Sequence, residues 1–214
     1  ITTPAVTDDS VTLAKMAPGT DGNIISYDAS GNPVAVATGS AGQVLTSAGA
    51  GAPPTFAAAP GITMADQWRQ LGGSVSAGDT FITSNWERTD TDSYGTIGSA
   101  MSESSGVFTF PATGIYYLQF FFQGKNTSGS VSRYTDGFID VTTNNSSYNL
   151  AASGFASSAG NLRDFNCTAT FILDVTNTSN VKIKTAFQVE HTCSMYGSTD
   201  STSTNLTVIR LGDT

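Results

Sequence analysis

VFTFPATGIYYLQFFFQGKN, residues 107–126, contains two apolar runs that flank a Pro and a Gly, and the second run alternates as a sheet strand does. Successive side chains of a strand point to opposite sides of the sheet. One side carries Tyr116, Leu118, Phe120 and Phe122, and the other carries Ile115, Tyr117, Gln119, Phe121 and Gln123. A strand of a single-chain sandwich needs only one apolar face, whereas both faces are largely apolar here. The strand is therefore either buried on both sides within one chain or packed against a partner chain.

Residues 61–214 are predicted to consist almost entirely of strands, and no segment shows a helical apolar stripe. The expected strands are Gln67–Leu71, Thr80–Trp86, Met101–Phe110, Ile115–Gln123, Tyr134–Thr142, Tyr148–Ala156, Phe165–Val175, Val181–Val189 and Asn205–Leu211. Asn177 to Asn180 is expected to be a hairpin loop between two of them. Many short strands separated by regular turn signals predict an all-β sandwich or jelly roll.

The first sixty residues differ in composition, because Tyr27 and Phe56 are their only aromatic residues. The segment 19–37 recurs as 39–57, with Gly, Pro and apolar positions matching at a spacing of twenty residues. Each copy predicts a turn, a short strand, a Gly/Pro turn and a second strand. We interpret residues 1–60 as a stem or joining region and 61–214 as a head domain, with a flexible linker as the alternative for the first part. Residues 9–16 fit either one helical turn or a strand.

The composition restricts the class of partner. Only 12% of the 214 residues are charged and the formal net charge is −8, which argues against nucleic-acid binding and against anionic membrane surfaces. No apolar run is long enough to cross a bilayer, so no membrane insertion is expected. A polar, weakly charged chain with aromatic strands suits an extracellular or virion protein.

Cys167 and Cys193 are the only cysteines, and each falls on or near an expected strand. They allow one disulfide or remain two buried thiols, and both alternatives stay open. No CxxC motif is present and the chain has one His, so no zinc site is expected.

Catalytic arrangements receive little support. A Ser-His-Asp triad would need His191, and no nucleophile-elbow motif accompanies it. Glycosidases use two carboxylates, and Asp90 with Asp92 or Asp136 with Asp140 are the candidate pairs. We interpret these as solvated surface acids, and we assign no catalytic, cofactor-binding or metal-ligating residue. The chain is predicted not to be an enzyme.

Exposed loop aromatics are the expected recognition elements, because Tyr and Trp combine a large rigid contact area with a polar edge. The candidate receptor-contact residues are Trp86, Tyr94, Tyr134, Tyr148, Phe155 and Tyr196. Such side chains suit a glycan or a protein as the ligand.

Residues 107–126 resemble the signature of the C1q and tumour-necrosis-factor (TNF) jelly-roll superfamily. Phe108 precedes Gly114 at the expected spacing, Tyr116 and Phe120 match, and Leu118 stands where the family has Phe. The resemblance covers about residues 66–214 and implies a homotrimer whose inner strands pack around a three-fold axis. It would place Ile115, Tyr117 and Phe121 at the trimer interface.

Residues 7–57 resemble modules of bacteriophage tail fibres, through DDSVTLAKMAPGTDGN, YDASGNP, GSAGQVLTS and GAPPTF in that order. Together the two resemblances imply a fibre on the exterior of a phage virion, with a trimeric head that binds the host surface. The N-terminal part would then contact other tail or capsid proteins. The alternatives are a head fibre or capsid decoration protein without a specific receptor, and a polysaccharide-depolymerising tail spike.

Overall fold

The computed structural model describes residues 19–59, 61–91, 93–160 and 162–214, and all its regular elements are strands. The chain divides into two units between Gly61 and Ile62. The alternative of a helical turn or a strand at residues 9–16 lies outside the described residues.

Two antiparallel hairpins make up the described part of the first unit. They are formed by β1 (Ile24–Tyr27) with β2 (Pro33–Val36) and by β3 (Gln43–Thr46) with β4 (Thr55–Ala58). In the first turn, the Asp28 carboxylate accepts hydrogen bonds from the backbone N–H groups of Ser30 and Asn32. Gly31 adopts a φ of 79°, a conformation that favours glycine. Each copy of the sequence repeat therefore forms one hairpin.

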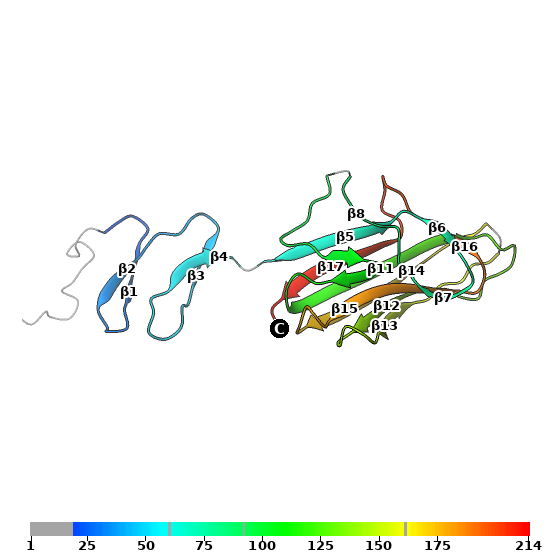
Figure 1. Ribbon diagram of the computed structural model, residues 1–214. Helices are drawn as coiled ribbons and strands as arrows, with labels where there is room; N and C mark the ends of the chain where they lie inside the picture. Colours follow the sequence, from blue (N-terminus) through cyan, green and yellow to red (C-terminus); the bar gives the residue numbers. More distant parts are fainter. Residues whose placement is uncertain (1–18, 60, 92, 161) are drawn as a thin grey trace, which may run out of the picture. The chain divides into compact units, whose positions relative to one another are not determined.

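The second unit, called the head below, is a sandwich of two sheets (Figure 1). The inner sheet contains β5 (Met64–Gln70), β6 (Gly73–Val75), β8 (Trp86–Arg88), β11 (Gly114–Asn126), β14 (Asp164–Val175), β16 (Cys193–Met195) and β17 (Asn205–Gly212). The outer sheet contains β7 (Gly78–Phe81), β9 (Ser102–Ser104), β10 (Val107–Thr109), β12 (Thr135–Thr142), β13 (Asn149–Gly154) and β15 (Lys182–Val189). The prediction of an all-β jelly-roll sandwich is confirmed for the head.

β11 is the central strand of the inner sheet. It pairs along its length with β14 on one edge, and with β17 and then β16 on the other. Its burial alternates at every residue, and Tyr116, Leu118, Phe120 and Phe122 are all 0% exposed. The Phe122 ring packs against Phe187 of the outer sheet at 5.8 Å between centroids. One predicted face of the strand therefore forms the core.

Two predicted strands were wrong in extent. Met101–Phe110 is interrupted, because Ser105 and Gly106 have φ values of 52° and 79° and turn the chain back between β9 and β10. A Cβ at Gly106 would lie 2.3 Å from the Ile82 carbonyl oxygen, so only glycine fits there. Thr80–Trp86 is also interrupted, since Asn85 has a φ of 62° and β7 and β8 lie in different sheets.

Cys167 and Cys193 are both buried free thiols, which decides between the two alternatives for these residues. Burial raises the pKa of the Cys167 thiol to about 12 and that of Cys193 to about 11. The thiolate is the reactive form, so the folded protein is expected to resist iodoacetamide at pH 8. Unfolded in urea without reductant, each chain should gain two carbamidomethyl groups by intact mass. Rapid labelling of folded protein, or no labelling of unfolded protein, would contradict this expectation.

Candidate interaction surfaces

The side of the inner sheet that faces away from the core, called the open sheet face, carries a continuous apolar row. Directly paired residues of neighbouring strands share a face. Tyr117 of β11 lies opposite Ile172 of β14 and opposite Ile209 of β17. Ile209 is paired with Ala65 of β5, which bridges to Ile97. Ile172 is 62% exposed and Ile97 46%, so the row is accessible in one chain.

Uncharged polar side chains flank one side of this row. Gln119 lies opposite Thr170 and Thr207, and the Gln67 amide donates to the Thr207 hydroxyl at 2.9 Å. The Tyr117 hydroxyl donates to the Gln119 side-chain oxygen at 3.2 Å. On this side the apolar row is bordered by hydrogen-bonding groups without charge, a composition typical of protein–protein contacts. On the other side Asp174 lies opposite Ile115.

The three residues expected at a trimer interface all lie on the open sheet face. Ile115, Tyr117 and Phe121 alternate with the core residues of β11 and are half-buried. The structure adds Ile172 and Ile209, which the sequence analysis did not select. The sequence pattern could have indicated Ile172. It is the one large apolar residue on a strand face whose other members, Thr168, Thr170 and Asp174, are polar.

A buried carboxylate holds the β5 edge of the inner sheet. The Asp66 side chain is 0% exposed and pairs with Arg88 at 3.2 Å. It accepts hydrogen bonds from the Trp68 indole N–H at 3.1 Å, the Met101 backbone N–H at 2.9 Å and the Tyr94 hydroxyl at 2.9 Å. These bonds attach β8 and the connection that follows it to β5, and so help to position Ile97 in the apolar row.

Two of the receptor-contact candidates have structural contacts within the head. Trp86 does not lie on a loop: it belongs to β8 and its ring packs edge-on against Phe108 at 5.2 Å. Tyr94 is half-buried. Burial is the main cause that raises the pKa of its hydroxyl to about 12, and the hydrogen bond that this hydroxyl donates to Asp66 raises it further. Both residues help to hold β8 and its connection on the sandwich.

The other candidates do not form one patch. Phe155 follows β13 and is 74% exposed, whereas Tyr134 and Tyr196 are half-buried. The Tyr196 hydroxyl donates to Asp164 at the start of β14. Tyr148 packs against Phe81 on the outer sheet at 6.3 Å between ring centroids. Receptor contact by these residues stays a prediction.

The carboxylate pairs have unequal environments. Asp90 pairs with the fully buried Arg69 at 2.7 Å, and Asp92 lies outside the described residues. Asp136 is 5% exposed and accepts a hydrogen bond from Ala156, so the prediction of a solvated acid was wrong for it. Burial raises the pKa of the Asp140 carboxyl, the charge of Asp79 raises it further and Lys184 lowers it.

Neither a cluster of metal-ligating side chains nor a helix able to cross a membrane is present in the part of the chain that the structure describes. No three His, Cys, Asp or Glu side chains there are grouped to hold a metal ion. Nor does that part contain a helix with the length and apolar character needed to cross a membrane.

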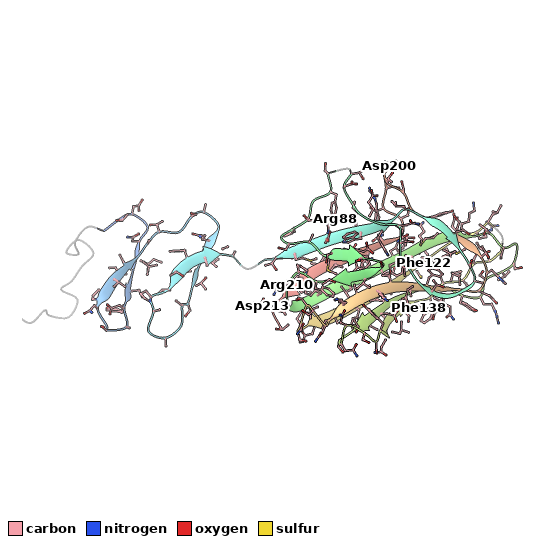
Figure 2. The ribbon with its side chains drawn as sticks, viewed as in Figure 1. Arg88, Phe122, Phe138, Asp200, Arg210 and Asp213 are labelled. Atoms are coloured by element: carbon pink, nitrogen blue, oxygen red, sulfur yellow. The ribbon has the colours of Figure 1, made fainter. Side chains whose placement is uncertain are left out.

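The face of the outer sheet that points away from the core contains a hollow. Phe81 of β7 lies opposite Ala186 of β15, which in turn lies opposite Phe138 of β12. Because Ala186 is small, a cavity of about 340 Å³ opens between the two rings. Figure 2 labels Phe138 on this sheet.

Polar groups surround this hollow. Asp79 lies opposite Gln188, and Asp140 lies opposite Leu150, which is 59% exposed. All four residues line the cavity. The sequence analysis selected Asp140 but missed Asp79, because only the pairing of β7 and β12 with β15 places the two residues around the same hollow.

Comparison with known proteins supports the fold of the head. No protein-family model matches the chain, and no curated protein matches its sequence. The Eiger TNF of S. frugiperda matches with a TM-score of 0.54 at 13% identity, over 72% of this chain and 96% of that chain. Murine APRIL at pH 8.5 and pH 8.0 gives TM-scores of 0.49 at 10% identity, over 69% of this chain and 98% of those chains. At such identities the likeness concerns the fold alone, and the head has the jelly-roll fold of TNF proteins.

Proposed function

We propose that this chain is a phage virion fibre protein whose homotrimeric head binds the host cell surface. The observation that carries the proposal is the apolar row on the open sheet face, from Ile172 through Tyr117 and Ile209 to Ile97. A monomer would expose this row to water, and burial of apolar area contributes about 25 cal/mol per Å². Two further copies of the chain would cover it.

The place of the row is compatible with the three-fold arrangement that the resemblance of residues 66–214 implies. The centre of the row is on β11, so three heads can meet with their β11 strands nearest the axis. Gln119, Thr170 and Thr207 would border the apolar contacts with hydrogen-bonding groups that carry no charge.

The first unit would join the head to the virion. Its hairpins expose most of their residues, including Ile25 at 58% and Leu45 at 47%. A two-stranded hairpin buries too little apolar surface to be stable alone. Packing against equivalent hairpins of the other two chains, or against tail or capsid proteins, would bury these residues. The resemblance of residues 7–57 to phage fibres supports the same role.

Adsorption would depend on multiple weak contacts. A trimeric head presents each surface site three times, and linked sites can exceed the affinity of a single one by about 10²–10⁴. No step of this mechanism requires catalysis.

The 214-residue protein is expected to block adsorption of its phage. Cells preincubated with micromolar protein should show an adsorption rate at least about tenfold lower, since linked sites compete with avidity. Heat-unfolded protein at the same concentration is the control. An unchanged rate, with the protein located on the capsid in virion images, would favour the decoration alternative. Shortening of purified host polysaccharide would favour the depolymerase.

A further inference from the structure

The hollow on the outer sheet has the chemistry of a small-ligand site. Its volume of about 340 Å³ lies within the range of about 300–1,000 Å³ usual for ligand pockets. Phe138 is only 8% exposed although it is on the side of the sheet away from the core. Phe81 and Leu150 lie on the two sides of the hollow, so its walls are apolar while its rim is polar.

The rim offers hydrogen-bonding groups that face the ligand space. The carboxylates of Asp79 and Asp140 accept hydrogen bonds, and the amide of Gln188 both donates and accepts. The charges of Asp79 and Lys184 both act on the Asp140 carboxylate, and a carboxylate has acceptor sites for more than one hydrogen bond. It can therefore accept a hydrogen bond from a hydroxyl-bearing ligand.

We propose that this hollow binds one neutral hexose unit of a host-surface glycan, a site that rests on the proposed adsorption role. A pyranose ring has apolar C–H groups that pack against accessible apolar side chains such as Phe81 and Leu150, which are 38% and 59% exposed. Its neighbouring hydroxyls match the two oxygens of a carboxylate, and hydrogen bonds to charged acceptors are the stronger kind.

The local charge selects against acidic sugars. Asp79 and Asp140 both line the hollow, so a uronate or sialate would meet two like charges. The neighbouring Lys184 ammonium lies over the rings of Phe81 and Tyr148, at 4.8 and 4.4 Å from their centroids. This cation–π contact holds the positive charge at the edge of the hollow.

The site also remains accessible in the proposed trimer. The hollow and the open sheet face belong to different sheets and lie on opposite outer sides of the sandwich. Association through the open sheet face therefore leaves three hexose sites pointing outward, as binding through avidity requires.

Saturation-transfer NMR of the 214-residue protein tests the site with methyl glycosides of galactose, glucose, mannose and N-acetylglucosamine. At least one should receive saturation, and methyl glucuronide should not. Asp140→Ala and Leu150→Ala should each weaken that binding by about tenfold, since one removes a charged acceptor and the other an apolar wall. Asp200→Ala is the matched control, because Asp200 is exposed on a loop away from Phe138 (Figure 2).

The outcomes separate this site from the adsorption role. No saturation of any neutral glycoside, or equal binding of the glucuronide, overturns the hexose site. If wild-type protein blocks adsorption and Asp140→Ala blocks it equally well, the site is overturned while the adsorption role stands. If the glycoside binds at the hollow but wild-type protein leaves adsorption unchanged, the site stands and the adsorption role fails.

Discussion

Replacing Tyr117 with Asp is expected to convert the proposed homotrimer into monomers. Tyr117 is at the centre of the apolar row, between Ile172 and Ile209. Three carboxylates would then meet near one axis, each without a partner of opposite charge. Removing a charge from water without such a partner costs several kcal/mol. The mass in solution should fall from that of three chains to that of one chain, which is 22.1 kDa.

Sedimentation velocity or light scattering measures this change directly. Phe155→Asp is the matched control, because Phe155 is a large apolar residue that is 74% exposed and follows a strand of the other sheet. That variant should remain trimeric. A wild-type protein that is monomeric at micromolar concentration, or a Tyr117→Asp variant that stays trimeric, would overturn the proposed interface.

Replacing Asp66 with Ala is expected to destabilise the head by about 3–5 kcal/mol, the usual cost of breaking a buried ion pair. The variant leaves the buried Trp68 indole and the Met101 backbone N–H without their acceptor. Arg88 loses its buried partner but keeps access to water, since its side chain is 38% exposed. The melting temperature should fall by about 10 °C, from about 2–4 °C per kcal/mol for a domain of this size.

Calorimetry of the 214-residue protein provides the measurement. Asp66→Asn keeps one acceptor oxygen and should cost less than Asp66→Ala. Asp200→Ala removes an exposed carboxylate and should leave the melting temperature within about 1 °C, because exposed sites rarely contribute more than ±0.5 kcal/mol. A melting temperature for Asp66→Ala equal to that of Asp200→Ala would show that the Asp66 hydrogen bonds do not hold the β5 edge.

The sequence predicted the fold from local periodicity. The alternation in residues 115–123 separates Tyr116 and Phe120 from Tyr117 and Phe121, and β11 buries the first set completely. Turn residues were harder to read, because Ser105 and Asn85 adopt positive φ without being glycine. This is why two of the predicted strands were too long.

Environment changed the interpretation of individual side chains. Trp86 is of a residue type that is common in recognition sites, but its ring packs against Phe108 inside the head. Nothing in the sequence distinguishes Asp66 from the other acidic residues, yet its side chain is fully buried and accepts several hydrogen bonds. Burial depends on contacts between distant segments, which a local pattern does not contain.

The sequence by itself determined that β11 has two apolar faces, because the two-residue period of a strand is a local property. Only the tertiary structure decided which residues share those faces across strands. Tyr117 meets Ile172 and Ile209 through the registers of β11 with β14 and β17. Asp79 reaches the same hollow as Asp140 because β7 and β12 pair with opposite edges of β15. Register between strands far apart in the chain is set by the packing of the whole sandwich, because a shift of one residue would turn every buried side chain outward.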